Sequence, residues 1–295
     1  MVLGKLYLVG TPIGNLEDMT FRAIKTLKKV DFIAAEDTRH TGKLLQYFEI
    51  TTPQLSYHDH NHQSRLPSLL HHLHQGKSLA LVSDAGMPGI SDPGYELVQA
   101  CLEQEIEVIP IPGVTAVITA LVASGLPTDR FSFEGFLPTK PKERSDRLEN
   151  LTQDLRTLIF YEAPHRLRET LTDLAQYFGG ERLIVTGREL TKLHEEFWRG
   201  TLTEAIAHYQ KVMPKGEFTV IVQGKISARE QNLSENVLKA ELTQLIASGM
   251  SRSQASRHLA QMTQLPRRQL YQLALSLESA DSELINEPVN KPLKN

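Results

Sequence analysis

The sequence lacks several features, and each absence excludes a class of protein. The 295 residues include 1 Cys, so an internal disulfide and a zinc site built from cysteines are excluded. No apolar run reaches the roughly 18 residues that a membrane-spanning helix needs. The first residues do not combine a charged segment, an apolar core and a cleavage site, so we expect no secretory signal. We therefore expect a cytoplasmic protein without membrane contact.

An excess of charge of one sign is also missing. The formal net charge is −3, with 23% charged and 40% hydrophobic residues, which is ordinary for a globular protein. This balance gives no global sign of nucleic-acid binding. The length suggests two domains, with room for a small appendage. The single Cys101 lies in an apolar helical pattern with Leu97, Val98 and Leu102, so we expect it to be buried.

Short apolar runs alternate with helical patterns through residues 1–123, which we take as an N-terminal α/β lobe. Continuous apolar runs of this length are typical of strands buried on both faces, and they occupy Lys5–Val9, Phe32–Ala35, Leu79–Val82 and Glu107–Ile111. The alternation predicts a parallel sheet covered by helices. The loop after the first run contains glycines without the G-x-G-x-x-G spacing of a Rossmann dinucleotide site.

The lobe is organised around residues 79–94, L-A-L-V-S-D-A-G-M-P-G-I-S-D-P-G. Leu79–Val82 reads as a buried strand, and the following Ala85–Ile90 cannot be helical because it holds two Gly and a Pro. In open α/β sheets ligands bind beyond the carboxyl ends of the strands, where glycines allow close approach to the backbone. A turn that needs small residues only for packing is the alternative. The two Asp and the Met of this loop favour a binding site.

Composition changes at Ser124–Thr128, and residues 124–226 mix strands and helices less regularly. We take them as a second α/β lobe with a mixed sheet. After it, residues 234–278 show short amphipathic helices and no strand pattern. Residues 234–276 carry five Lys or Arg against two Glu, a net charge of +3. This basic helical piece indicates either an RNA-contact domain or a solvated dimer arm. Residues 279–295 are expected to be a disordered tail.

Several loop motifs, taken together, resemble one family. They are L-Y-L-V-G-T-P-I-G-N-L, A-E-D-T-R, Y-H-D-H-N, S-D-A-G-M-P-G-I-S-D-P-G, I-P-G-V-T-A, Y-E-A-P-H-R and K-G-E-F-T. None is specific alone. Across residues 4–276 the combination is similar to the S-adenosylmethionine-dependent proteins of the tetrapyrrole-methylase fold, and among them to those that methylate the 2′-hydroxyl of a cytidine in 16S rRNA. Met87 stands where members often have Thr.

The resemblance implies a two-lobed body that holds folded S-adenosylmethionine between its lobes, forms a homodimer and acts on the 16S rRNA of the small ribosomal subunit. The cofactor contacts that it implies, carried over by motif, are Pro12, Asp84, Ala85, Gly86, Met87, Pro88, Ile90, Thr115, Ala116, Tyr161, Phe218 and Thr219. Substrate contacts are expected at Asn15, His58, His60, Arg166 and Arg188, and in the C-terminal helices at Arg252, Arg257, Arg267 and Arg268.

A ribose 2′-hydroxyl is a weak nucleophile, so we expect a nearby proton acceptor. Among the charged residues at strand ends, the catalytic candidates are Glu36, Asp37, Arg39, Glu189 and Lys192. Each can instead form a structural ion pair. We hypothesise that residues 36–39 line the pocket for the target nucleotide.

The alternating His58, His60 and His62 also fit a metal site on one face of a strand. We favour substrate contact or a proton relay for the first two and expect no metal, because methyl transfer needs none. Two other functions stay open: methylation of a small tetrapyrrole-like substrate, and a non-catalytic RNA-binding assembly factor on the same fold. The basic helices argue against the first, because a small substrate needs no such arm.

Overall fold

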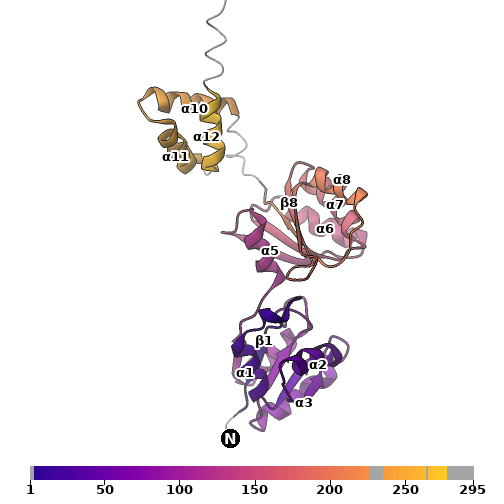
Figure 1. Ribbon diagram of the computed structural model, residues 1–295. Helices are drawn as coiled ribbons and strands as arrows, with labels where there is room; N and C mark the ends of the chain where they lie inside the picture. Colours follow the sequence, from indigo (N-terminus) through magenta and orange to yellow (C-terminus); the bar gives the residue numbers. More distant parts are fainter. Residues whose placement is uncertain (1–2, 226–234, 264, 278–295) are drawn as a thin grey trace, which may run out of the picture. The chain divides into compact units, whose positions relative to one another are not determined.

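A computed structural model describes residues 3–225, 235–263 and 265–277 (Figure 1). The chain divides into two compact units, residues 1–225 and 226–295. Within the described ranges, no helix is both long and apolar enough to cross a membrane. The predicted disordered tail, residues 279–295, lies outside the described residues.

The first sheet is built from five parallel strands in the order β3-β2-β4-β1-β5. The strands are β1 (Leu6–Val9), β2 (Phe32–Ala35), β3 (Gln54–Ser56), β4 (Leu79–Val82) and β5 (Val108–Ile111). The helices between them are α1 (Phe21–Lys29), α2 (Thr38–Tyr47), α3 (His62–His74) and α4 (Tyr95–Glu103), with a short 3-10 helix η1 (Leu16–Asp18). The predicted parallel sheet is confirmed.

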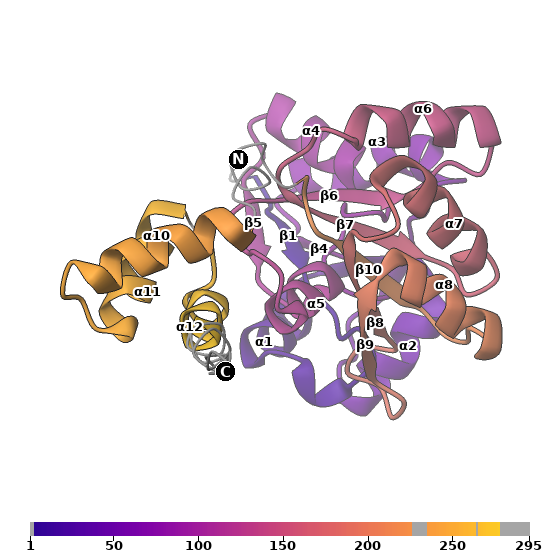
Figure 2. The same ribbon diagram turned by 90° about the horizontal axis from the view of Figure 1, so that it is seen from above.

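Both faces of this sheet are buried, as the apolar run of β4 predicts. Ala80 and Val82 pack in the cluster that contains the buried residues of α1 and α2, whereas Leu79 and Leu81 pack with those of α3 and α4. Figure 2 shows these helix pairs on opposite sides of the strands. Each buried Leu or Val side chain contributes about 1.5–3 kcal/mol of apolar burial. Cys101 belongs to the α3–α4 side and is 0% exposed, as predicted.

Helix α2 and strand β3 were not predicted from the sequence. The segment that forms α2 reads as polar, but Asp37 caps its first turn, and Leu44 and Leu45 bury its inner face. Strand β3 is an edge strand of three partly exposed residues, so it lacks an apolar run. Short edge strands of this kind are common, because they limit pairing of the exposed edge with another chain.

The second sheet is mixed, as predicted, with strand order β6-β7-β10-β8-β9. Strands β6 (Phe131–Phe136) and β7 (Thr157–Glu162) run parallel, whereas β8 (Leu183–Arg188), β9 (Glu196–Thr201) and β10 (Phe218–Val222) add antiparallel pairs. Helices α6 (Pro141–Leu151), α7 (Leu167–Phe178) and α8 (Leu202–Lys211) cover one face. Helix α5 (Ala116–Ser124), which the composition placed with the first lobe, covers the other face.

The second unit consists of three helices, α10 (Glu235–Ala247), α11 (Arg252–Thr263) and α12 (Arg267–Ser276). They enclose a core of their own, whose buried residues are Leu238, Leu242, Ala255, Leu259, Leu270 and Ala274. The predicted small helical domain is confirmed. Its separate core explains why the hydrophobic pattern changes after Gly224.

Candidate functional site

Three loops meet at the carboxyl edge of the first sheet. The strand order places β1 beside β4, and from these two strands the chain turns in opposite directions, toward β2 and β5. Such a switch point opens a crevice between the loops. Here the loops are joined, because Thr11 and Gly86 exchange backbone hydrogen bonds of 2.9 and 3.1 Å. The third loop touches the first: a Cβ built on Gly10 would lie 2.7 Å from the Cα of Gly113.

A cavity of about 310 Å³ opens beside these loops, with walls from both lobes. The loops after β1, β4 and β5 form one wall, and the ends of β6 and β7 with the start of β10 form the other. Its lining residues are Ile13, Ala85, Gly86, Met87, Ile90, Ser91, Asp92, Thr115, Ala116, Phe136, Tyr161, Glu162, Ala163, Pro164, Leu190, Glu217, Phe218 and Thr219. We call this the large cavity.

Nine of the twelve residues predicted to contact the cofactor line the large cavity. Pro12 and Asp84 line a neighbouring cavity instead, and Pro88 is buried and lines neither. Asp92, which belongs to the S-D-P-G segment and was not among the predicted site residues, also lines the large cavity. The second wall also includes Phe136, whose ring lies 5.6 Å from that of Tyr161. Burial raises the pKa of Tyr161 to about 12, so its hydroxyl stays neutral.

The neighbouring cavity, here called the small cavity, has a volume of about 220 Å³. It is lined by Thr11, Pro12, Gly14, Leu16, His40, Thr41, Lys43, Leu44, Ser83 and Asp84. The two cavities adjoin, because consecutive residues of the same loops line one and then the other. Ser83 and Asp84 face the small cavity, and Ala85 and Gly86 face the large one.

Three carboxylates gather at this edge, Glu36, Asp84 and Asp92, and within the part of the chain that the structure describes none of them forms an ion pair. Asp84 donates its backbone N–H to Glu36 Oε2 at 3.3 Å and accepts from the backbone N–H of Asp37 at 3.1 Å. Burial, followed by repulsion from Glu36, raises the pKa of Asp92 from an ordinary value of 3.8 to about 6. A side-chain hydrogen bond from Ser83 opposes the shift. Burial also raises the pKa of Glu36, and the Asp84 carboxylate adds to that shift.

Asp37 and Arg39, predicted to be catalytic, form a bidentate pair with each other. The Asp37 carboxylate accepts from Arg39 Nε at 3.1 Å and from Nη2 at 2.7 Å, and it also caps α2. The Arg39 side chain is 88% exposed. The hydrogen bonds from Arg39 hold the pKa of Asp37 well below its usual range. Neither residue lines either cavity, so their place in the target pocket stays a prediction.

Glu189 and Lys192 belong to an ion-pair network in the turn after β8. Lys192 Nζ lies 3.0 Å from Glu189 Oε1 and 2.9 Å from Glu217 Oε2. The backbone N–H of Glu217, followed by Lys192, lowers the pKa of Glu189. Of the three, Glu217 lines the large cavity. The catalytic role of Glu189 and Lys192 stays a prediction, and their contacts give both residues a structural role.

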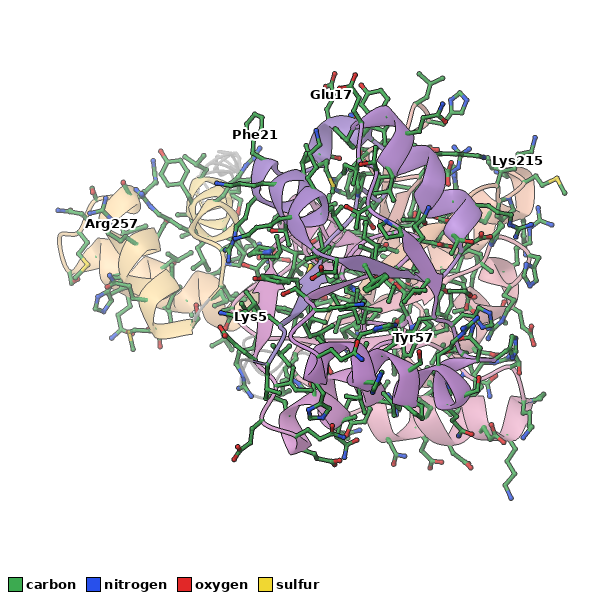
Figure 3. All side chains as sticks on the ribbon, turned by 90° about the horizontal axis from the view of Figure 1, so that it is seen from below. Lys5, Glu17, Phe21, Tyr57, Lys215 and Arg257 are labelled. Carbon is green, nitrogen blue, oxygen red and sulfur yellow. The ribbon has the colours of Figure 1, made fainter. Side chains whose placement is uncertain are left out.

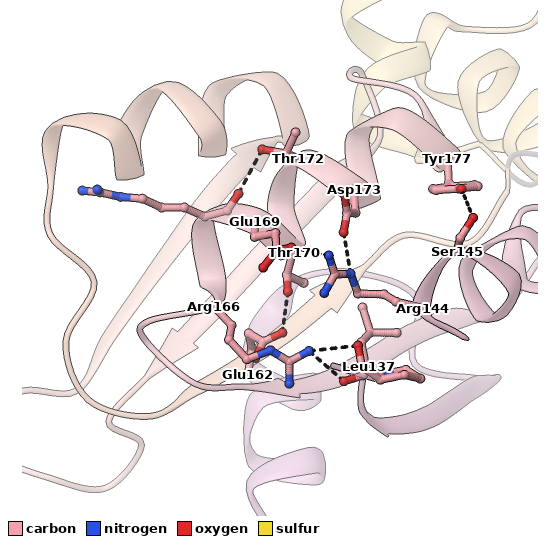
Figure 4. Close-up of polar contacts among 12 residues, drawn as sticks. Leu137, Arg144, Ser145, Glu162, Arg166, Glu169, Thr170, Thr172, Asp173 and Tyr177 are labelled. Atoms are coloured by element: carbon pink, nitrogen blue, oxygen red, sulfur yellow. Dashed lines mark hydrogen bonds and ion pairs between the residues drawn. The ribbon is translucent and has the colours of Figure 1, made fainter. Parts of the chain in front are cut away.

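Arg166 and Arg188 are both engaged within the second lobe. Arg166 donates to the carbonyl oxygens of Leu137 and Pro138 and lies 3.7 Å from the buried Glu162 (Figure 4). Glu162 also accepts a 2.5 Å bond from Thr170. Arg188 donates to the carbonyl of Lys215 at 2.7 Å and to Glu196 at 3.1 Å. These bonds fix loops around the large cavity, so substrate contact by either arginine would need a second role.

The prediction that His58, His60 and His62 share one strand face is wrong. Strand β3 ends at Ser56, His58 and His60 follow in a turn, and His62 begins α3. The Asn61 side chain ties this turn by bonding both His58 Nε2 and the His58 backbone N–H. Among the described residues no group of three or more His, Cys, Asp or Glu is placed to hold a metal ion. Asn15 accepts a bond from Glu17 N–H as the cap of η1.

Comparison with known proteins agrees with this architecture. The family model described as Tetrapyrrole (Corrin/Porphyrin) Methylases matches residues 5–206. The chain belongs to this family. Its fold resembles that of uroporphyrin-III-C-methyltransferase from Thermus thermophilus, with 22% identity, a TM-score of 0.54, and coverage of 74% of this chain and 94% of that one. Diphthine synthase is similar at 12% identity and a TM-score of 0.58, over 75% and 90% of the chains.

Two relatives are similar over nearly the full length. A protein of Synechocystis sp. named "Ribosomal RNA small subunit methyltransferase I" is 62% identical, covering 94% of this chain and 99% of its own. A protein of the same name from Halalkalibacterium halodurans is 49% identical, covering 92% and 94%. The methylase family depends on S-adenosylmethionine, which is therefore the cofactor of this methyltransferase.

The lining of the large cavity suits S-adenosylmethionine. Apolar side chains and small-residue loops dominate the lining, so backbone groups are accessible to a ligand. Gly86 has a φ of +79°, a backbone conformation that residues other than glycine rarely adopt. Asp92 supplies a negative charge to a cavity that would hold a sulfonium cation.

The C-terminal unit matches a model described as the RsmI C-terminal HTH domain over residues 239–278. Of the four predicted RNA contacts, Arg257, Arg267 and Arg268 are exposed and Arg252 is partly buried. Figure 3 shows Arg257 projecting from α11. Arg267 donates to the Ser253 hydroxyl at 2.9 Å, which links the first turns of α11 and α12. RNA contact by these residues stays a prediction.

Proposed function

We propose that this methyltransferase transfers a methyl group from S-adenosylmethionine to the 2′-hydroxyl of a cytidine ribose in 16S rRNA. The observation that supports it best is the pair of adjoining cavities. The large one suits the donor, with the predicted contacts Ala85–Met87, Thr115, Tyr161 and Thr219. The small one is lined by His40 and Lys43, which suit a nucleotide with its phosphate. The names of the relatives favour small-subunit rRNA as the substrate.

Transfer requires the two ligands to meet at the wall between the cavities. When bound, S-adenosylmethionine supplies an activated methyl group, and the protein supplies alignment. The target nucleotide must leave its stack to reach the small cavity. His40 and Lys43 then hold its phosphate, while the loop of residues 83–86 separates the base from the donor.

We assign Asp92 as the proton acceptor for the ribose hydroxyl. It lines the large cavity, and Asp84, whose charge helps to raise its pKa, lines the small one, which supports a place for Asp92 near the boundary. Its pKa of about 6 leaves it ionised at neutral pH, yet more basic than an ordinary aspartate. A positioned base of this kind typically contributes 10²–10⁴-fold to the rate.

The proposal is tested with tritiated S-adenosylmethionine and small ribosomal subunits from a strain that lacks the corresponding modification. We expect label in 16S rRNA, resistant to alkaline cleavage at one cytidine because a methylated 2′-oxygen cannot attack the neighbouring phosphate. Label in a tetrapyrrole, label on a base, or no label with bound cofactor would each contradict the proposal. Binding of S-adenosylmethionine, measured by calorimetry, shows in every case whether the protein is competent.

A further inference from the structure

A third cavity, of about 300 Å³, lies against helix α1 and has no part in the site above. It is lined by Tyr7, Arg22, Lys25, Thr26, Lys29, Val30 and Ser78. Val30 and Ser78 lie just before the starts of β2 and β4. This cavity therefore extends to the edge of the first sheet at which these strands begin. The large and small cavities open at the carboxyl edge. A ligand here would therefore bind at a distinct site.

The cavity gathers positive charge that the folded chain does not neutralise. Arg22, Lys25 and Lys29 are exposed and follow one another at spacings of three and four residues, so they form one stripe along α1. In the described part of the chain, no carboxylate forms an ion pair with any of them, whereas Lys5, Lys140 and Lys239 each have one. Asp31, the nearest acidic residue after α1, accepts the backbone N–H of Ser78 at 2.7 Å.

Helix stability does not explain this stripe. Like charges at such spacings destabilise a helix by about 0.2–0.5 kcal/mol per pair. Lys29 in the last turn is favoured by the helix dipole, but Arg22 lies in the first turn, where the same dipole disfavours a cation. The arrangement costs stability in the free protein, and an anion bound from outside would offset that cost.

The spacing fits a chain of phosphates better than a single anion. From Arg22 to Lys29 the helix rises about 10 Å. A nucleic-acid strand carries one phosphate per roughly 3.4 Å of its axis, so several phosphates of one strand fit within the length of the stripe. The Tyr7 and Ser78 side chains add hydroxyl groups, which commonly contact phosphates and sugars. At the start of the same helix Phe21 is 94% exposed and projects outward (Figure 3). Exposed aromatic rings beside cations serve as stacking platforms for unpaired bases.

We propose that α1 and its cavity bind the sugar–phosphate backbone of the RNA that presents the target nucleotide, at a distance from the methylated ribose. The inference rests on the proposed function, because it takes the RNA substrate from it. It assigns to the first lobe a share of RNA affinity that is separate from the C-terminal helices. The contact adds to affinity and leaves the chemical step unchanged.

The test compares two double variants of the full-length protein that remove equal charge from the first lobe. K25Q/K29Q removes two cations of the cavity. K28Q/R65Q removes two exposed cations, from α1 and α3, that do not line it. Binding to unmethylated small subunits is measured from 50 to 200 mM KCl, with kcat at saturating subunits and S-adenosylmethionine affinity by calorimetry.

We expect K25Q/K29Q to weaken binding about tenfold or more and to reduce the slope of log affinity against log salt by about 1.4–1.8, which corresponds to two phosphate contacts. Its kcat and cofactor affinity should equal those of the wild type, and K28Q/R65Q should bind within about twofold of it. Phe21→Ala should weaken binding about fivefold or more without a change of slope; an unchanged affinity removes Phe21 from this surface.

Equal affinity and slope in the two double variants would overturn the inference while leaving the proposed function intact, provided that the wild type methylates 16S rRNA. A wild type that binds cofactor but modifies no RNA would instead overturn the proposed function. The two failures are therefore distinguishable in one set of measurements.

Discussion

The carboxylates at the carboxyl edge of the first sheet differ from those in the turn after β8. Asp92 and Glu36 are partly buried, and within the described residues neither forms an ion pair; their pKa values are raised. Glu189 accepts from a backbone N–H and from Lys192, and its pKa is lowered. A carboxylate that is stabilised as an anion is a poor proton acceptor, whereas one that is destabilised is a better one. The carboxylates of the first lobe are therefore the better proton acceptors, and those in the turn after β8 stabilise the second lobe.

The largest expected effect comes from Asp92→Asn. The amide keeps the shape of the side chain but cannot take a proton, so kcat should fall at least 100-fold. Cofactor affinity, measured by calorimetry, should fall by a smaller factor than kcat, because the variant also removes one negative charge beside the sulfonium. Ser91, which also lines the large cavity, provides the control: Ser91→Ala should keep kcat within about threefold. A kcat for Asp92→Asn near that of the wild type would place the proton acceptor elsewhere.

The reaction rate and the stability of the folded state should depend on pH in opposite directions. Below pH 6 the rate should fall tenfold per pH unit, because Asp92 becomes protonated near its pKa of about 6. The folded state holds this proton more tightly than the unfolded state does. The stabilisation from Asp92 is thus complete below about pH 4 and is lost as pH rises through 6.

The same group therefore makes the protein less stable where it is active. At pH 7.5 Asp92→Asn should raise the free energy of unfolding by about 1 kcal/mol, after allowance for solvent screening. Urea denaturation at pH 7.5 and pH 4 measures this, with the gain expected at the higher pH and absent at the lower one. A variant that is destabilised at pH 7.5 would show that the carboxylate is structural.

The smallest effect is expected for Lys192, in the turn after β8. Lys192→Met removes the cation between Glu189 and Glu217, and it should lower the free energy of unfolding by about 0.5–1 kcal/mol. The rate should stay within about threefold, because the backbone N–H of Glu217 still bonds Glu189. Thermal denaturation and steady-state kinetics on one preparation give both values. A loss of rate beyond tenfold would restore Lys192 as a catalytic residue.

The sequence predicts the parts of the fold in which pattern and burial agree. The bounds of β2 and β4 are those of their apolar runs, because a strand buried on both faces needs an apolar residue at every position. Strand β3 and the edge strand β9 lack that requirement and were missed. Helix α2 was missed because its first turn is polar and only its inner face is apolar.

The site was predicted unevenly for a related reason. Loop residues such as Ala85, Gly86 and Thr115 were found from their motifs, and they line the large cavity. Ion pairs such as that of Lys192 with Glu217 join segments that are distant in the chain. The sequence therefore does not show which charged residues are paired. Asp92 was not predicted as a base, because its partial burial near Glu36 and Asp84 becomes visible only once the loops are assembled.

The close approach of Gly10 and Gly113 limits how this enzyme can change over time. A methyl group on either residue would meet the other's backbone within 3 Å, so no substitution is tolerated without moving two loops at once. New substrate preferences must therefore arise by replacements outside this junction, for instance around Lys43 or on the outer surface of α1.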